Sequence, residues 1–202
     1  MKVCDSLEQR RSIKYFDPEH VMTAAEKEQL IRHVMYSPTA FNIQNWRFVM
    51  VEDKTIRQEI RKAAWDQPQV SEASLLIVLC FDKLAWARDP QRYWAHAPED
   101  VATQFVSEIQ DFYRDDEALQ HDEGMRSCGI AAQSLMLLAK EMGYDSCAMD
   151  GFDFKRVGHL INLPGDHEIC MLLTIGKRLR DPWPRGDLLP VEEVCFTDRF
   201  PD

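Results

Sequence analysis

Three cations and a hydroxyl lie within five residues near the start of the chain, in the run Arg10-Arg11-Ser12-Ile13-Lys14. Guanidinium groups bind phosphate oxygens through paired hydrogen bonds, a serine adds a further donor, and a lysine supplies a point charge that can reach a second group of the same ligand. The run is therefore a candidate phosphate site. The competing interpretation is a solvated charge run, which is the commoner role of such clusters.

Two polar loops could complete a binding site around a heteroaromatic ligand. The first is Tyr36-Ser-Pro-Thr-Ala-Phe-Asn-Ile-Gln-Asn-Trp46, whose hydroxyls and amides offer several hydrogen bonds. The second is Asp66-Gln-Pro-Gln-Val70, in which we expect Gln69 to project near the edge of a sheet. Taken alone, the first is equally well a turn that ends a helix, and the second is only a turn.

Other chemistries lack their sequence signals. The chain has 8 glycines but no GxG and no GxxxxGK, so a Rossmann fingerprint and a P-loop are absent. The 6 cysteines include no CxxC pair and no cluster with histidines at zinc-ligand spacing, so we expect no metal site. We also expect reduced thiols and a cytoplasmic location. No catalytic triad is evident, and no side chain is predicted to be catalytic.

The charge balance excludes several kinds of partner. Acidic residues number 34 against 24 basic ones in 202 residues, giving a formal charge of −10. Nucleic acids and anionic membranes require a broad basic surface, which this composition does not favour. The N-terminus has no apolar signal segment, and the longest hydrophobic run, Leu75 to Phe81, is too short to span a bilayer. We expect no nucleic acid and no membrane as partners.

The first half of the chain must position these segments with a helix and two strands. Thr23-Ala-Ala-Glu26 is a capping box, and the helix that it opens continues to Met35 before Ser37-Pro38 ends it. A strand is predicted at 46–51, followed by a short helix that Thr55 could cap. The continuous apolar run from Leu75 to Phe81 predicts a central strand that is covered on both faces.

The second half begins with an irregular or short helical excursion, about 83–117, which is the best candidate for a lid. Helical spacing returns from Val101 to Phe112, and a second helix ends at Gly143. Its stretch from Cys128 to Met142 is apolar nearly all round, which predicts burial in the core or in a subunit interface. A short helix at 154–161, a strand at 169–175 and a proline-rich tail follow. The pattern favours an α+β fold.

In this order and spacing, the basic run and the two loops resemble the nitroreductase family of FMN-dependent oxidoreductases. The resemblance continues through 131–143, Met149-Asp-Gly-Phe-Asp153, Leu163-Pro164 and Thr174-Ile-Gly-Lys177, and covers nearly the whole chain. It implies one nitroreductase-like domain over 1–202, with a central mixed, mainly antiparallel sheet covered by helices. It also implies an intertwined homodimer with two FMN sites at the interface, in which residues 182–202 pack on the partner subunit.

The resemblance also assigns roles to residues. Arg10, Arg11 and Ser12 would hold the phosphate and ribityl chain, and Lys14 would approach the pyrimidine end of the flavin. The remaining cofactor-binding candidates are Pro38, Thr39, Ala40 and Asn42 from the partner chain, with Gln69, Asp150, Gly151, Arg178 and Arg185. The candidates for a lid over the substrate are Phe41, Trp86, Tyr93 and Trp94, although aromatic side chains more often fill a core. Asp66, where family members often have Asn, is left out because an ionised carboxylate cannot donate a hydrogen bond.

The implied activity is a ping-pong transfer of hydride from NADH or NADPH, through FMN, to a nitroaromatic, quinone or related small-molecule acceptor. Because the flavin carries the redox chemistry, the protein needs no nucleophile and no metal. Two alternatives remain open at this point. One is a specialised flavin reductase, enone reductase or dehalogenase, and the other is a flavin-binding carrier without turnover.

Overall fold

A four-stranded antiparallel sheet lies at the centre of the computed structural model, which describes residues 2–201. The strands stand in the order β1-β2-β4-β3 and every neighbouring pair is antiparallel. Their bounds are β1 (Trp46–Met50), β2 (Leu75–Asp82), β3 (Asp145–Met149) and β4 (His167–Gly176). One parallel bridge, between Ser12 and Ser146, adds the N-terminal segment to the outer edge of β3. The predicted mixed, mainly antiparallel sheet is confirmed.

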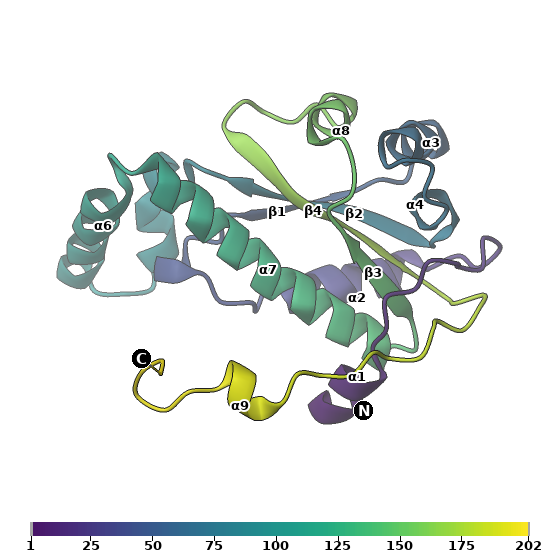
Figure 1. The fold of residues 1–202 in the computed structure, drawn as a ribbon. Helices are drawn as coiled ribbons and strands as arrows, with labels where there is room; N and C mark the ends of the chain where they lie inside the picture. The colour runs from purple at the N-terminus through teal and green to yellow at the C-terminus, as the bar shows by residue number, and fades with distance from the viewer. Residues whose placement is uncertain (1, 202) are drawn as a thin grey trace.

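Helices cover both faces of this sheet, so the fold has three layers (Figure 1). Helices α2 (Ala24–Val34) and α7 (Glu117–Glu141) cover one face. Helices α3 (Lys54–Ala63), α4 (Gln69–Glu72) and α8 (Phe154–Leu160) cover the other. The α+β class that the sequence pattern favours is therefore confirmed.

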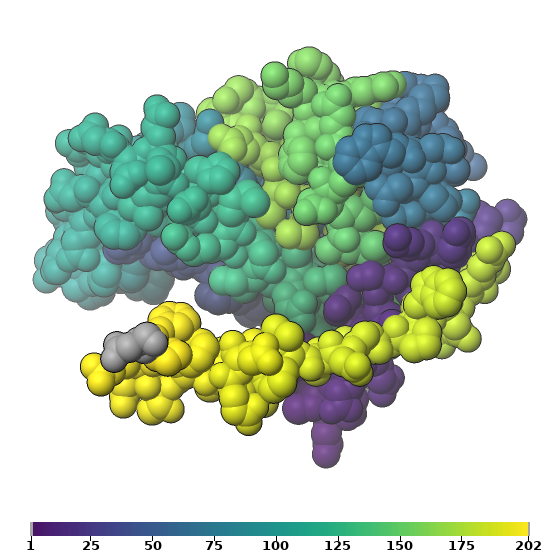
Figure 2. Space-filling view, in the orientation of Figure 1, coloured from purple at the N-terminus to yellow at the C-terminus, as the bar shows by residue number. Residues whose placement is uncertain are grey.

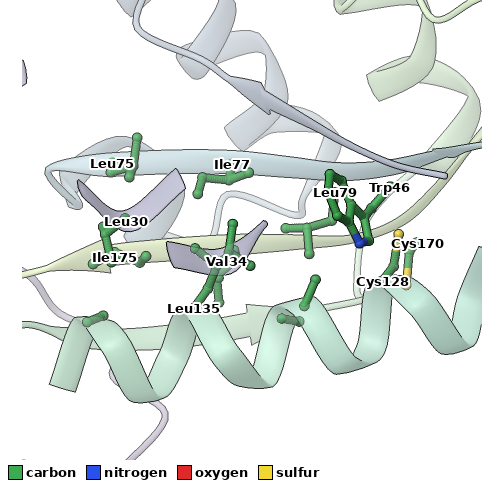
Figure 3. Packing of buried hydrophobic residues seen from close by; sticks show 14 of the residues in the cluster. Leu30, Val34, Trp46, Leu75, Ile77, Leu79, Cys128, Leu135, Cys170 and Ile175 are labelled. Atoms are coloured by element: carbon green, nitrogen blue, oxygen red, sulfur yellow. The ribbon is translucent and has the colours of Figure 1, made fainter. Parts of the chain in front are cut away.

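Strand β2 is buried along its whole length, as its continuous apolar run predicts. Because side chains alternate along a strand, Leu75, Ile77 and Leu79 face α2 and α7, while Leu76 and Val78 face the opposite layer. Figure 3 shows Leu75, Ile77 and Leu79 on the side of the sheet that faces these two helices. The strand is therefore a double-sided core element that fixes the positions of the helices on both faces.

The helix starts depend on local capping. Thr23 and Glu26 form the predicted capping box of α2, with the Thr23 side chain accepting from the Glu26 backbone N–H. The predicted cap of α3 is wrong: Asp53 caps this helix, and its carboxylate accepts from the backbone N–H groups of Thr55 and Ile56. The helix begins at Lys54, so Thr55 already lies inside its first turn and cannot cap it.

Several short elements were not predicted. Strand β3 has no continuous apolar run and owes its burial to its pairing with β4. Helix α1 (Val3–Gln9) rests on α7 and places Arg10 directly after its last turn. Helices η1 (Ala40–Asn42) and α9 (Val191–Val194) were not predicted either, whereas α5 (Ala85–Arg88) and η2 (Pro90–Trp94) lie in the excursion for which short helices were one prediction. Among the described residues, no helix is long and apolar enough to cross a membrane.

The excursion after β2 has a small core of its own. It comprises α5, η2 and α6 (Glu99–Tyr113) and lies beside the N-terminal half of α7 (Figure 1). The excursion core contains Trp86, Tyr93, Ile109 and Tyr113, joined by Ile43. Of the two forms that the sequence leaves open for this excursion, short helices are therefore the one that occurs, and its aromatic side chains bury one another.

The C-terminal tail, residues 179–201, runs from β4 across α1 along one face of the molecule (Figure 2). Its apolar side chains are largely exposed to solvent; they are Leu179, Trp183, Leu188, Leu189, Val191, Val194 and Phe200. A concentration of exposed apolar side chains on one segment is typical of a surface that another chain covers.

A buried tyrosine links α2 to the end of α7. The Tyr144 hydroxyl donates to Glu26 Oε1 at 2.7 Å and lies 3.2 Å from His20 Nε2. Hydrogen bonds from Thr23 and then from Tyr144 lower the pKa of Glu26 from 4.5 to about 2. Burial, followed by the bond to Glu26, raises the pKa of Tyr144 to about 12.

Replacing Tyr144 should therefore change the acid stability of the protein. Because the folded pKa of Glu26 lies below its unfolded value, this stabilisation is present above about pH 4.5 and is lost as the pH falls toward 2. Tyr144→Phe should lower the urea midpoint at pH 7 and lose less stability between pH 5 and pH 2 than the unmodified protein. Urea titrations at several pH values test this, and parallel pH profiles for the two proteins would contradict it.

Candidate functional site

The predicted basic run lies along the outer edge of β3. The Ile13 backbone N–H donates to the Ser146 carbonyl at 3.0 Å, and Ser12 forms the parallel bridge to Ser146. Ile13 is 1% exposed and anchors the segment in the core, whereas Ser12 and Lys14 are exposed. The alternation of an extended segment therefore presents the serine and the lysine at the surface beside β3.

Two cations of this run have no acidic partner. Among the described residues, neither Arg10 nor Lys14 has a carboxylate oxygen within 4 Å, and the Arg10 guanidinium instead lies 4.0 Å from the sulfur of Met136 on α7. Burial raises the pKa of the Cys147 thiol on β3, and Lys14 and Arg10 oppose that rise, so both charges act on this strand. In a protein with excess acidic residues, unpaired cations at one edge favour an anionic ligand.

The two arginines predicted from the C-terminal segment lie in different places. Arg185 donates to the backbone carbonyls of Glu8 at 3.0 Å and Arg10 at 2.6 Å, so the structure brings it to the Arg10 segment. Arg178 instead lies 3.8 Å from Asp145 and 3.3 Å from Asp181. Arg185 is therefore the nearer of the two to Arg10, whereas the charge of Arg178 is matched by carboxylates.

Arg11 faces the tail. Its guanidinium donates a hydrogen bond to the backbone carbonyl of Trp183. The indole of Trp183 is itself 90% exposed, so this contact ties the path of the tail to the basic run without burying the aromatic ring. The structure thus joins Arg11 to the segment that carries Arg185.

A chain of amides joins the other predicted segments. Gln67 Nε2 donates to the Gly151 carbonyl at 3.0 Å, and Gln69 Nε2 donates to Gln67 Oε1 at 3.0 Å. The ring of Trp65 lies close to Gly151: a Cβ added at Gly151 would be 2.7 Å from it. The structure therefore brings Gln69 and the Asp150-Gly151 turn together through Gln67, a residue that sequence reasoning did not select.

Two buried polar atoms near these residues lack hydrogen-bond partners within residues 2–201. They are Ser146 Oγ, on the strand that pairs with Ser12, and Gln69 Oε1, at the end of the amide chain. A buried polar group without a partner is costly, so such atoms indicate a missing ligand or water. A phosphate-bearing heteroaromatic ligand fits these polar groups, since the cations follow the outer edge of β3 and the amides lie at the turn after it.

The loop with the remaining predicted contacts follows α7 from Ser134, which accepts from Ser37 Oγ at 3.1 Å, toward the start of that helix. The Ala40 backbone N–H donates to Glu123 at 3.3 Å, whereas Arg10 contacts Met136, which is 136 − 123 = 13 residues later on α7. At 1.5 Å per residue these contacts are about 20 Å apart along the helix. One chain therefore does not bring Ala40 to Arg10.

The same loop has an unusual backbone. Phe41, Asn42 and Gln44 all have positive φ, at 51°, 56° and 44°, which is uncommon for residues other than glycine. The Gln44 backbone N–H donates to Thr39 Oγ1, which helps to hold this geometry, and Pro38 and Asn42 are exposed. The predicted contact residues Pro38, Thr39, Ala40 and Asn42 are therefore presented on a tightly turned loop beside α7.

The aromatic residues predicted as a lid pack mostly with one another. Trp86 and Tyr93 are each 8% exposed within the excursion core, and Trp94 stacks on Phe105 with centroids 3.9 Å apart. Phe41 instead meets Phe112 of α6 edge to face, with centroids 5.7 Å apart. Phe41 therefore marks the point where the excursion touches the 38–42 loop.

Known proteins are similar to this chain in sequence and in fold. The sequence model of the nitroreductase family matches residues 7–177. The protein DrgA of Synechocystis is 48% identical over 181 residues, covering 90% of this chain and 86% of that protein. An oxygen-insensitive NADPH nitroreductase of Helicobacter pylori is 28% identical over 200 residues and covers 94% of each chain.

A solved structure extends the likeness to the fold. A protein from Exiguobacterium sibiricum, described as a nitroreductase in complex with FMN, superimposes with a TM-score of 0.90 at 23% identity, covering 98% of each chain. The three-layer fold is of the α+β class, and the relatives place this chain among the oxidoreductases. It belongs to the nitroreductase family, whose members use FMN and NAD(P)H.

Proposed function

We propose that this protein binds FMN along the edge of β3 and transfers hydride from NADH or NADPH to a nitroaromatic, quinone or related acceptor by a ping-pong mechanism. The observation that carries the proposal is the pair of cations without acidic partners, Arg10 and Lys14, beside the unpartnered hydroxyl of Ser146. A mononucleotide supplies the anionic group that these cations lack, and family membership identifies it as FMN.

Each part of the site has a task in this proposal. Arg10, Ser12 and Arg185 would hold the phosphate, and Lys14 would place a positive charge at the pyrimidine end of the ring. Bound FMN supplies the hydride chemistry, so the protein binds and orients two flat partners in turn. The other residues that the resemblance assigns stay predictions: Arg11, Pro38, Thr39, Ala40, Asn42, Asp150 and Arg178 for the cofactor, and Phe41, Trp86, Tyr93 and Trp94 for the acceptor.

The proposal includes a homodimer in which each site uses both chains. Ala40 and Arg10 contact α7 about 20 Å apart within one chain, which supports assigning the two residues at one site to different chains. The exposed apolar side chains of the C-terminal tail offer a surface for that second copy to cover. Both features support one symmetric assembly.

Absorbance of the purified protein tests the flavin, and anaerobic reduction tests the enzyme. We expect bands near 370 and 450 nm (approximate values for oxidised flavin) and bleaching by NADH or NADPH, then recovery of the bands when a quinone or nitroaromatic is added. A protein that takes up no FMN would refute the whole proposal. A yellow protein that neither nicotinamide bleaches would be a flavin carrier and not an oxidoreductase.

A further inference from the structure

The amide chain at the turn after β3 has a fixed direction. The Gly151 carbonyl can only accept a hydrogen bond, so Gln67 must present its N–H to it, at 3.0 Å. The oxygen of Gln67 then faces Gln69 and accepts from Gln69 Nε2, also at 3.0 Å. Consequently Gln69 must present its oxygen at the free end, where Oε1 is buried without a partner.

Helix α3 holds this amide chain rigidly. Arg57 donates from Nε and Nη2 to the Val70 carbonyl at 3.1 and 2.9 Å, and from Nη2 to the Ala73 carbonyl at 2.6 Å. The Asp153 backbone N–H donates to the Ala63 carbonyl at 2.9 Å, so the turn that contains Gly151 is attached to the end of the same helix. The two ends of the amide chain therefore share one support.

Arg61 strengthens the same support from the next turn of α3. Its guanidinium donates to Asp66 Oδ1 at 2.7 Å and to Ser71 Oγ at 2.9 Å, on either side of Gln67 and Gln69. Groups that are held in place before a ligand arrives lose little conformational entropy on binding. Gln69 is thus an acceptor whose polarity is set before any ligand binds.

We propose that Gln67 is a positioning residue that fixes Gln69 as a hydrogen-bond acceptor for a ring N–H of the bound cofactor. The inference rests on the proposed function, in which that cofactor is FMN. Oxidised isoalloxazine carries one ring N–H, at N3 in the pyrimidine part, and its carbonyl oxygens and other nitrogens accept. An oxygen at the free end of the amide chain therefore selects the N3–H over every other group on the ring edge.

The experiment removes each side of this hydrogen bond in turn. Dissociation constants for FMN and for 3-methyl-FMN, which lacks the N3–H, are measured by flavin fluorescence with the unmodified protein, Gln69→Leu and Gln67→Leu. Gln58→Leu is the matched control, because Gln58 is exposed on α3 and makes no contact with the amide chain.

The unmodified protein and Gln58→Leu should bind FMN about 10-fold more tightly than 3-methyl-FMN, in line with the loss of one hydrogen bond. Gln69→Leu and Gln67→Leu should both lose most of this preference, although Gln67 is one hydrogen bond further from the ligand than Gln69. An undiminished preference in Gln69→Leu or in Gln67→Leu would overturn the inference. Equal binding of both flavins by the unmodified protein would overturn it while leaving the proposed function intact, and binding of neither would overturn both.

Discussion

Arg10→Ala is expected to weaken FMN binding by about 10- to 100-fold, the cost of losing a charged hydrogen-bond donor to a phosphate. Arg10 has no carboxylate within 4 Å among the described residues, so the substitution leaves no acidic side chain unpaired. The loss should therefore appear in ligand affinity and leave the stability of the free protein nearly unchanged. Fluorescence titration with FMN and a thermal melt without FMN measure the two effects.

Arg32→Ala is the matched control for this prediction. Arg32 lies on α2 in an exposed pair with Glu28 and should have no effect on FMN affinity, because surface pairs of this kind contribute little. Equal losses of affinity in the two variants would show that net charge, and not the position of Arg10, governs binding.

Mixed dimers extend the same prediction to the shared site. Asn42→Glu places a negative charge on the loop that the proposal assigns to the partner's cofactor. Homodimers of Asn42→Glu, like homodimers of Arg10→Ala, should therefore bind FMN more weakly than the unmodified protein. Refolding the Arg10→Ala and Asn42→Glu chains together should restore about a quarter of the sites, because half of the dimers are mixed and each has one intact site. No recovery in dimers shown to be mixed would mean that one chain supplies both residues to each site.

The parts of the fold that follow local rules could be read from the sequence. The Thr23 capping box and the continuous apolar run of β2 both depend on neighbouring residues, and both occur where they were expected. Strand β3 could not be found in this way, because Asp145, Ser146 and Cys147 are buried by elements remote in sequence, among them β4 and the segment of Ile13. Helix α1 likewise rests against α7, which is remote in sequence.

The candidate site likewise contains residues that local sequence indicates and residues whose roles depend on remote contacts. The Arg10 and Lys14 cluster is contiguous in sequence, so composition and motif alone indicated it. The role of Gln67 depends on Gly151, 84 residues away, and no local pattern signals that contact. Arg178 and Arg185 were indistinguishable within one basic segment, and only the folded path of the tail separates a guanidinium beside Arg10 from one beside Asp145.

Gly124→Ala should destabilise the protein by about 1–3 kcal/mol, despite the better helix propensity of alanine. Gly124 is buried on α7, and a Cβ added there would lie 2.1 to 2.5 Å from three ring atoms of Phe81 on β2. Phe81 is fully buried, so its ring cannot move aside without disturbing the core. Helix α7 must therefore shift away from the sheet, and urea titration of the variant measures the cost.

Gly129→Ala isolates the cause, because it is the same substitution five residues later on the same helix. A Cβ at Gly129 would meet no atom within 4 Å, so the change should raise stability by about 0.5–1 kcal/mol through helix propensity alone. Opposite signs for the two variants would assign the loss at Gly124 to the contact with Phe81. Similar stabilisation by both would contradict the close approach of α7 to β2, on which the positions of Glu123 and Met136 along the site depend.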